Sequence, residues 1–311
     1  MMRFHFRRSV AALVATSLLA VAITPAFASA LTISGSTTLF PLASKWASVY
    51  KSKFGGSITV VGGGSGKGIS DARTGVVNIG MSSRMQTSGD GAVYFTPVAR
   101  DALVIVVSAN LRNAYPNYIY KMSTTMVQKI FRGQVTNWRQ VNSHLPNHAI
   151  DLVGRTGSSG TYTYFKQMFL TNLSSTGEIG TTMYKQSPRT RTYASNGIVR
   201  STVANDEYAI GYLSEAYVNS TVKPLNLPTP AHYYDVHYAI HDTPASTVGH
   251  YVRPSMTTAA NGTYKYVRPL YFVTAGTSAP SGSVKTFIDW CKSKSSGKGQ
   301  SYCSGQHFLK L

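Results

Sequence analysis

The chain has 311 residues, of which 30 are Lys or Arg and only 11 are Asp or Glu, so its formal net charge is +19 at pH 7. The positive residues are scattered rather than gathered in a run of five or six, which argues against a basic tail that binds nucleic acid. A positive field would attract small anions. A shortage of carboxylates would also suit a protein that lives in acid, and the composition leaves both explanations open.

The first 30 residues have the three parts of a signal peptide. Arg3, Arg7 and Arg8 form a basic start, residues 10–23 are apolar, and residues 28–30 read Ala-Ser-Ala, a small-residue cleavage site. The apolar run is too short for a membrane anchor, and no cysteine follows the cleavage site for lipid attachment. We therefore expect a periplasmic or secreted protein without a lipid anchor, whose mature charge is 19 − 3 = +16.

The mature chain begins with a strand, a loop of small hydroxyl residues and a helix. Residues 31–34 read as a short strand, and residues 39–50 carry apolar side chains at helical spacing. Between them, Ser36, Thr37 and Thr38 lie where a helix N-terminus offers free N–H groups and a partial positive charge. These residues could bind an oxyanion, or they could simply cap the helix.

A second unit of the same kind follows. Residues 57–61 read as a β-branched strand, residues 62–68 as Gly-Gly-Gly-Ser-Gly-Lys-Gly, and residues 69–73 as a helix. The resemblance to a nucleotide-binding P-loop is superficial, because Lys67 is followed by glycine instead of Ser or Thr and no Walker B acid is evident. What remains is a further candidate anion contact, at Ser65.

The next two predicted strands are short and apolar. Residues 76–80 form the first, and Ser83 lies just beyond its carboxyl end, where ligands bind in open α/β sheets. Residues 102–107 form the second, which is apolar throughout, as buried parallel strands are.

Residues 153–165 give the strongest anion-binding signal. A strand at 150–153 leads through small turn-forming residues into a helix whose apolar side chains recur from 162 to 169. The helix start supplies hydroxyls and N–H groups, a glycine permits close approach, and an arginine adds a permanent cation. An ordinary N-cap is the alternative. The residues offered to the anion are Arg155, Ser159, Gly160 and Thr161.

The rest of the chain continues the alternation of strands and helices. Predicted helices lie at 126–131, 198–204 and 284–291, and predicted strands at 208–213 and 267–273. Four strand–loop–helix units indicate an α/β architecture. Because the anion-binding loops fall in two distant regions, 34–84 and 155–161, we expect a cleft between two lobes to bring them together.

The sequence does not favour a metal centre or a catalytic centre. The eight histidines are scattered, and His-Glu-x-x-His and Cys-x-x-Cys motifs do not occur. No basic–aromatic pattern indicates a nucleic-acid groove. Cys291 and Cys303 lie 12 residues apart, and in an exported protein a local disulfide is the default expectation, with two free thiols as the alternative.

Five sequence motifs together resemble a known family. They are residues 34–41 (Ser-Gly-Ser-Thr-Thr-Leu-Phe-Pro), 64–68 (Gly-Ser-Gly-Lys-Gly), 79–84 (Ile-Gly-Met-Ser-Ser-Arg), Arg155 with Ser159-Gly160-Thr161, and 209–212 (Ala-Ile-Gly-Tyr). The chain is similar to the PstS-type phosphate-binding proteins of bacterial phosphate ABC transporters. This resemblance implies a two-lobed periplasmic-binding-protein fold of type II with the ligand in the interdomain cleft. Lobe I would comprise residues 31–108 plus 240–311, and lobe II residues 109–239.

The resemblance also implies a role for each site residue. Thr37 would offer its hydroxyl and Thr38 its N–H, Ser65 would bond a phosphate oxygen, and Arg155 would neutralise the charge. The helix start at 159–161 would donate further hydrogen bonds. Many family members carry an aspartate where Ser83 stands. That carboxylate accepts a hydrogen bond from protonated phosphate and so disfavours sulfate, which makes the selectivity of this chain an open question.

The implied function is a monomeric, non-enzymatic receptor without a cofactor that hands phosphate to the membrane permease of an ABC transporter. Two alternatives from other classes are kept. The first is a secreted phosphatase on the same scaffold, for which no well-placed nucleophile is found in the sequence. The second is a basic surface or matrix protein that binds anionic polymers, which would show strong salt dependence.

Overall fold

The computed structural model describes residues 30–174, 177–179, 186–235 and 239–311. The predicted signal peptide lies, except for its last residue, outside the described residues. Across the described ranges, no helix combines the length and the apolar character needed to cross a membrane.

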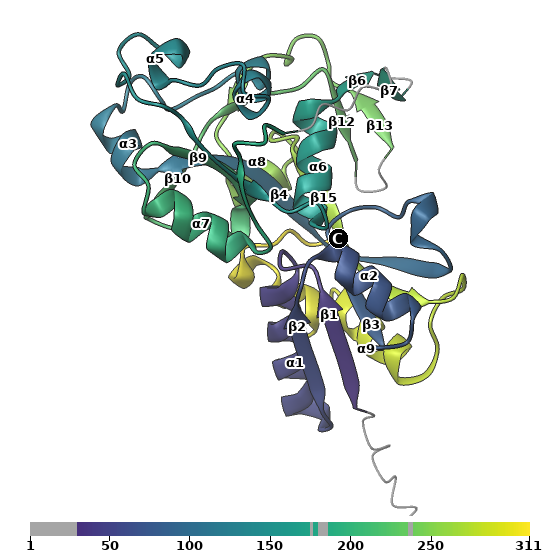
Figure 1. Ribbon diagram of the computed structural model, residues 1–311. Coiled ribbons are helices and arrows are strands. Elements are labelled where there is room, and N and C mark those ends of the chain that lie inside the picture. Colours follow the sequence, from purple (N-terminus) through teal and green to yellow (C-terminus); the bar gives the residue numbers. More distant parts are fainter. Residues whose placement is uncertain (1–29, 175–176, 180–185, 236–238) are drawn as a thin grey trace, which may run out of the picture.

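The predicted elements are present, with shifted ends, and further short ones join them (Figure 1). The helices are α1 (Phe40–Phe54), α2 (Ser65–Arg73), α3 (Ala109–Ala114), α4 (Thr124–Phe131), α5 (Trp138–Val141), α6 (Gly160–Phe165), α7 (Asn196–Ala204), α8 (Met256–Ala260) and α9 (Gly282–Lys292). The strands are β1 (Leu31–Gly35), β2 (Ile58–Gly62), β3 (Ile79–Ser82), β4 (Val93–Ser108), β5 (Asp151–Arg155), β6 (Asn172–Ser174), β7 (Gly177–Ile179), β8 (Arg191–Tyr193), β9 (Ala209–Ser214), β10 (Val222–Pro224), β11 (Leu227–Pro228), β12 (His232–Tyr234), β13 (Ile240–Asp242), β14 (Tyr251–Val252) and β15 (Val267–Ala275). Short 3-10 turns lie at η1 (Ser88–Asp90), η3 (Glu215–Tyr217), η4 (Gly299–Tyr302) and η5 (Ser304–Gln306), and a π-helical segment, η2 (Lys166–Leu170), continues α6.

One large sheet organises the molecule. Its strand order is β2-β1-β3-β15-β4-β9-β5-β8, and β10 pairs with β4. The pairs β1–β2, β1–β3, β5–β8 and β5–β9 are parallel, whereas β4 and β15 run antiparallel to their neighbours. The first part of β4 pairs with β15 and residues 103–107 pair with β9, so β4 runs from one half of the sheet into the other.

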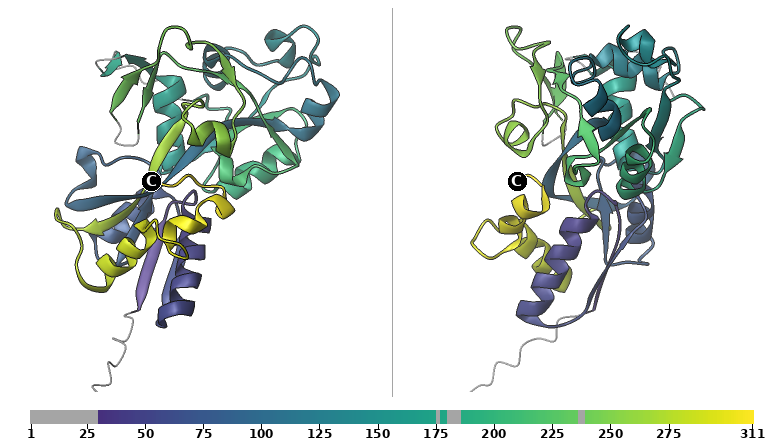
Figure 2. Two further views of the ribbon diagram at one scale, coloured as in Figure 1. Left: turned by 180° about the vertical axis from the view of Figure 1, so that it is seen from behind. Right: turned by 90° about the vertical axis from the view of Figure 1, so that its left-hand side faces the viewer.

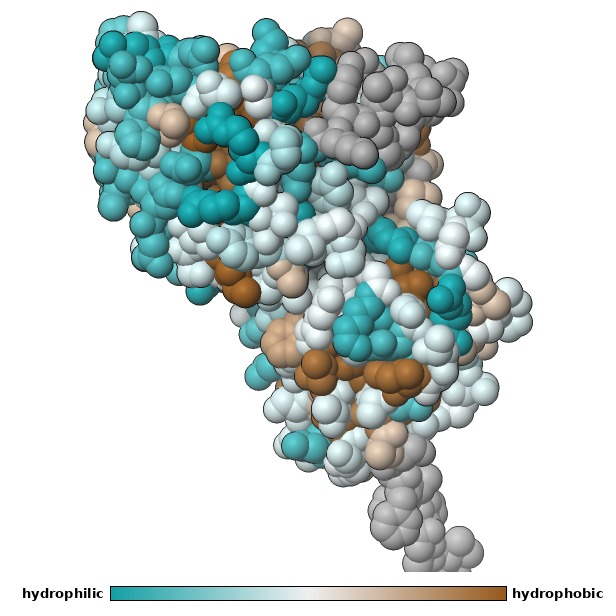
Figure 3. All heavy atoms as spheres, viewed as in Figure 1, coloured by the Kyte–Doolittle hydropathy of each residue, from teal (hydrophilic) through white to brown (hydrophobic). Residues whose placement is uncertain are grey.

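The views show two bulky parts joined by long strands. One part carries α1, α2, α9 and β1–β3, and the other carries α3 to α7 and β5–β9 (Figures 1 and 2). Where the two parts meet, the surface is mostly pale in Figure 3, the colour of residues of intermediate hydropathy such as Ser, Thr and Gly. The prediction of an α/β molecule in which two parts approach one another is thus confirmed.

The prediction of a parallel strand at 102–107 is wrong in its direction. The strand exists, but its neighbours on both sides are antiparallel. Its run of apolar residues has a different cause, because both of its faces are buried. Leu103, Ile105 and Val107 belong to one core cluster, while Val104 and Val106 belong to another.

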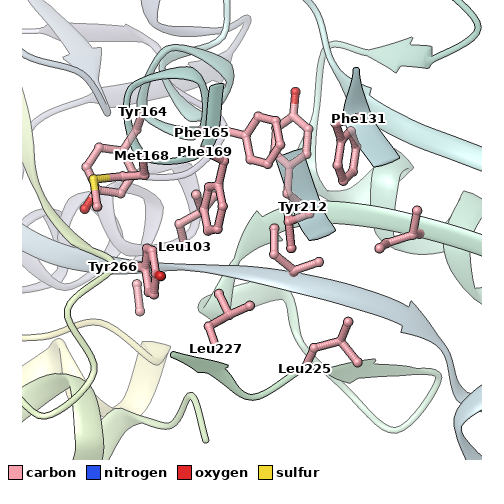
Figure 4. Close-up of a cluster of buried hydrophobic side chains, with 14 of the residues drawn as sticks. Leu103, Phe131, Tyr164, Phe165, Met168, Phe169, Tyr212, Leu225, Leu227 and Tyr266 are labelled. Carbon is pink, nitrogen blue, oxygen red and sulfur yellow. The ribbon is translucent and has the colours of Figure 1, made fainter. Parts of the chain in front are cut away.

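The largest core cluster supports the loops at 155–161. Phe165 of α6 stacks on Tyr212 of β9 with ring centroids 3.9 Å apart, and Phe131 of α4 packs against both rings (Figure 4). The predicted apolar pattern at 162–169 is confirmed as a helical face, shared between α6 and η2. This packing fixes the start of α6 against the sheet.

The two cysteines differ from the sequence prediction. Cys291 and Cys303 are free thiols in this structure, so the predicted disulfide is not formed in it. Both residues are completely buried in the core cluster that contains Trp46 and Phe287, where they pack as small apolar side chains. Burial raises the pKa of the Cys303 thiol to about 12, which keeps it protonated and unreactive at neutral pH.

Candidate anion-binding site

The loops predicted to bind an anion lie together although they are far apart in sequence. The hydroxyl oxygens of Thr38 and Thr161 are 3.0 Å apart and belong to residues separated by 123 positions. The hydroxyl oxygens of Ser65 and Ser83 are 3.2 Å apart, and the N–H of Ser83 donates to Ser65 Oγ at 3.0 Å. All four residues are buried. The structure therefore brings the two predicted regions into direct contact.

Glycine residues make this close approach possible. A Cβ atom added to Gly160 would lie 2.5 Å from Ser65 Oγ, 2.6 Å from Ser83 Oγ and 2.8 Å from the main-chain carbon of Ser83. Gly35, at the end of β1, has φ +129°, and a Cβ there would lie 2.5 Å from Met81 O. Neither position has room for a larger residue, so the sequence encodes the convergence of the loops.

Two of the predicted residues use their hydroxyl oxygens as acceptors in the turns that lead into helices. Ser36 Oγ accepts from the N–H of Leu39 at 3.4 Å. Ser159 Oγ accepts from the N–H of Thr161 at 3.1 Å and from that of Tyr162 at 3.4 Å. The capping alternative is thus correct for Ser159, the N-cap of α6, whereas the bond of Ser36 lies in the turn before α1, whose N-cap is Leu39. Each O–H remains a hydrogen-bond donor, because these bonds use the hydroxyl only as an acceptor.

Arg155 is buried with neutral partners. Its guanidinium donates to Asn196 Oδ1 at 2.7 Å, to Thr37 Oγ1 at 2.9 Å and to the carbonyl oxygen of Ala194 at 2.7 Å, and its Nε donates to that of Tyr193 at 3.2 Å. Only 1% of the residue is exposed. No carboxylate bonds this cation within the part of the chain that the structure describes, so an anion is the charge partner that the site lacks.

Burial lowers the pKa of Arg155 to about 10. The guanidinium therefore keeps its charge at neutral pH. Its position is fixed from the main chain, because the N–H of Arg155 donates to the hydroxyl of Tyr212 at 3.0 Å, and that hydroxyl donates to Gln186 Oε1 at 3.0 Å. A stacked aromatic core thus holds the end of β5 that carries the cation.

Three residues at the site were not predicted from the sequence. Asn196, at the start of α7, joins the two loops, since its Oδ1 accepts from Arg155 and its Nδ2 donates to Thr38 Oγ1 at 3.0 Å. Asp101 and Arg268 form a completely buried ion pair beside the same hydroxyls, with 2.8 Å between Arg268 Nη2 and Asp101 Oδ2. A charged residue next to or inside an apolar strand is the signal that could have revealed this pair.

Lys67 does not take part in the site. Its ammonium group pairs with Asp71, and half of its side chain is exposed. Helix α2 already begins at Ser65, so residues 62–64 form too short a loop to wrap around a nucleotide phosphate. In the residues that the structure describes, no group of three or more His, Cys, Asp or Glu could hold a metal ion.

Comparison with known proteins gives consistent matches. A model of the PBP superfamily domain matches residues 20–295. Protein SphX of Synechococcus elongatus is 26% identical over 293 residues, covering 90% of this chain and 78% of SphX. The phosphate-binding protein PstS of Borreliella burgdorferi is 30% identical over 200 residues, covering 63% of this chain and 67% of PstS.

A solved structure extends the match to the whole fold. It is described as a candidate phosphate ABC transporter substrate-binding protein from Clostridium perfringens with bound phosphate. It is 25% identical to this chain, with a TM-score of 0.70, and the match covers 91% of this chain and 99% of that one.

Proposed function

Because this chain belongs to the PBP superfamily, among the relatives of the PstS-type phosphate-binding proteins, we propose that it binds inorganic phosphate outside the cytoplasm and delivers it to the permease of an ABC transporter. The observation that carries the proposal is the buried guanidinium of Arg155, which has only neutral partners among the described residues and lies beside converging hydroxyls.

The donors for the anion come from both halves of the sheet. Arg155 supplies the full positive charge, and the hydroxyls and N–H groups around it supply hydrogen bonds. Charge-assisted hydrogen bonds to a desolvated oxyanion are about twice as strong as those between neutral groups. The proposed phosphate-binding residues are Ser36, Thr37, Thr38, Ser65, Ser83, Arg155, Ser159, Gly160 and Thr161.

The proposed mechanism is closure of two lobes around the anion. The lobes would comprise residues 31–108 plus 240–311 and residues 109–239, and β4 and β15 would connect them. Closure explains why Gly160 of one half touches Ser65 and Ser83 of the other. The protein acts as a monomeric receptor without a cofactor, and its role is binding instead of catalysis.

Titration calorimetry with phosphate, arsenate and sulfate tests the proposal. We expect heat of binding with phosphate at micromolar concentrations. Absence of phosphate binding would overturn the proposal. Hydrolysis of a chromogenic phosphate ester by the purified protein would instead identify an enzyme, and salt-dependent binding of acidic polysaccharide without any effect of phosphate would identify a polymer-binding protein.

A further inference from the structure

A second arginine, Arg268, lies at the centre of the contact between the two halves. It belongs to β15, and its register partner on β4 is Asp101. Both side chains are completely buried. Arg268 Nε and Nη2 donate to Asp101 Oδ2 at 3.2 and 2.8 Å, and Ser214 Oγ donates to Asp101 Oδ1 at 2.5 Å. This charge pair sits on the two strands that connect the halves of the sheet.

The remaining donor capacity of Arg268 reaches the proposed binding loops. Its Nη1 donates to the carbonyl oxygens of Ser83 and Gly160, each at 3.2 Å. Its Nη2 donates to Thr161 Oγ1 at 3.0 Å and to Thr38 Oγ1 at 3.4 Å. Thr38 and Ser83 belong to one half of the sheet, and Gly160 and Thr161 to the other. One side chain therefore bonds both loops at the place where they meet.

These bonds fix the direction in which the two threonine hydroxyls can donate. A guanidinium only donates, so Thr161 Oγ1 must accept from Arg268. Asn196 Oδ1 accepts from Arg155, which leaves Asn196 Nδ2 to donate to Thr38 Oγ1. Both hydroxyl oxygens thus act as acceptors toward protein N–H groups, and both O–H groups are left to donate.

The two O–H groups differ in whether the protein supplies an acceptor for them. The 3.0 Å contact between Thr38 and Thr161 uses one of them. Among the described residues, no acceptor is found for the other. A hydroxyl held as a donor is what an oxyanion requires, since a fully ionised oxygen accepts hydrogen bonds and donates none.

We propose that Arg268 is a positioning residue for oxyanion binding, which ties the two binding loops together and, with Asn196, leaves one O–H of the Thr38–Thr161 pair to donate to the anion. The inference rests on the proposed function, because it names a device of the same site. Asp101 supports this role, because it holds the guanidinium of Arg268 in place and balances the positive charge of Arg268. The charge of the bound anion would then be balanced by Arg155.

The competing explanation is that the Asp101–Arg268 pair serves only to stabilise the fold. Three variants distinguish this explanation from a role in binding. Asp101→Asn combined with Arg268→Gln removes both charges while keeping polar side chains of similar size. Arg268→Lys keeps the charge opposite Asp101 but replaces the planar fork of five N–H donors with one ammonium group of three, too few to bond Asp101, Ser83, Gly160 and Thr161 at once. Lys285→Gln is the control, because it removes the ion pair with Asp289 on the exposed face of α9, outside the proposed binding loops.

The measurement is the Kd for inorganic phosphate by calorimetry, with a thermal melt of each variant to verify folding. We expect the double variant Asp101→Asn/Arg268→Gln and the single variant Arg268→Lys each to raise Kd by about tenfold to a hundredfold, as loss of a charged hydrogen bond does. Lys285→Gln should leave Kd within about threefold of the wild type. Folded Arg268 variants with wild-type Kd would overturn the inference. If the double variant Asp101→Asn/Arg268→Gln does not fold, the Kd of Arg268→Lys alone tests the inference.

A double-mutant cycle with Thr161→Val tests whether Arg268 acts through the hydroxyl. In the Thr161→Val background, the change in log Kd caused by Arg268→Lys should be only about a third of the change that it causes in the wild type. Additive effects would refute the positioning role. Failure of the wild-type protein to bind phosphate would instead overturn the proposed function, so the two failures are distinguishable.

Discussion

Two arginines are buried near the same threonine and asparagine side chains in this molecule, and their charges are balanced differently. Arg155 donates to an amide oxygen, a hydroxyl and two main-chain carbonyls, all of them neutral. Arg268 donates to the carboxylate of Asp101, which lies opposite it in the sheet. The side chains are 1% and 0% exposed, so the difference does not come from burial.

This difference separates a cation that is balanced by a carboxylate of the fold from one that has no such partner among the described residues. A buried cation that has its own carboxylate is balanced within the fold, and it can orient neighbouring groups. A buried cation with only neutral partners has been desolvated without full compensation, and it gains most from a mobile anion. Burial lowers the pKa of Arg155, and the positive charge of Arg268 lowers it further. The two guanidinium groups therefore interact electrostatically.

Asp101→Asn gives the largest expected effect on stability. It leaves Arg268 buried without its carboxylate, and breaking a buried pair costs about 3–5 kcal/mol of unfolding free energy. Urea denaturation of the variant and the wild type measures this loss. Equal stability of the two proteins would show that Asp101 does not balance the charge of Arg268, and the contrast between the arginines would disappear.

Arg155→Met should act on binding more than on stability. Truncation of one partner of a buried charged contact costs about 2–5 kcal/mol of affinity, or roughly 30- to 4,000-fold in Kd. We expect a smaller loss of unfolding free energy than for Asp101→Asn, since no protein carboxylate is left unpaired among the described residues. Calorimetry with phosphate and urea denaturation measure the two quantities. Phosphate affinity within a few-fold of the wild type would show that the site is assigned wrongly.

Gly160→Ala tests whether contact between the two loops is needed for binding. The new Cβ would meet Ser65, Ser83 and the main chain of Ser83, and overpacking typically costs about 1–3 kcal/mol. We expect the phosphate Kd to rise by about fivefold to a hundredfold. Gly157→Ala on the same loop is the matched control, because a Cβ there meets nothing within 4 Å. Equal affinity of these two variants would contradict the need for close contact.

Ser83→Asp should give the smallest effect, a change in selectivity. An aspartate accepts a hydrogen bond from protonated phosphate but faces sulfate with an unpaired negative charge. We expect the ratio of sulfate Kd to phosphate Kd to rise by about tenfold, equivalent to ~1.4 kcal/mol. Competition of the two anions in calorimetry measures this ratio. An unchanged ratio would place Ser83 outside the contact with the anion.

The loops that form the candidate site were predictable because their signals are local. Hydroxyl residues between a strand and a helix are a local signal of a candidate anion-binding loop, and Ser36, Thr38, Ser65, Ser83 and Thr161 are all buried where these loops meet. Local signals have limits as well. The same pattern could not tell that Ser159 also caps its helix, since capping and anion binding need the same residue types.

The sequence by itself determined the alternation of elements, the hydroxyl and glycine loops and the presence of an arginine at the start of the 155–161 loop, because each depends on neighbouring residues. Only the tertiary structure decided which charges are balanced. The pairing of Asp101 with Arg268 joins residues 167 positions apart, and the register of β4 against β15 sets it. Electrostatic energy depends on distance in space and on burial, and neither can be read from spacing along the chain.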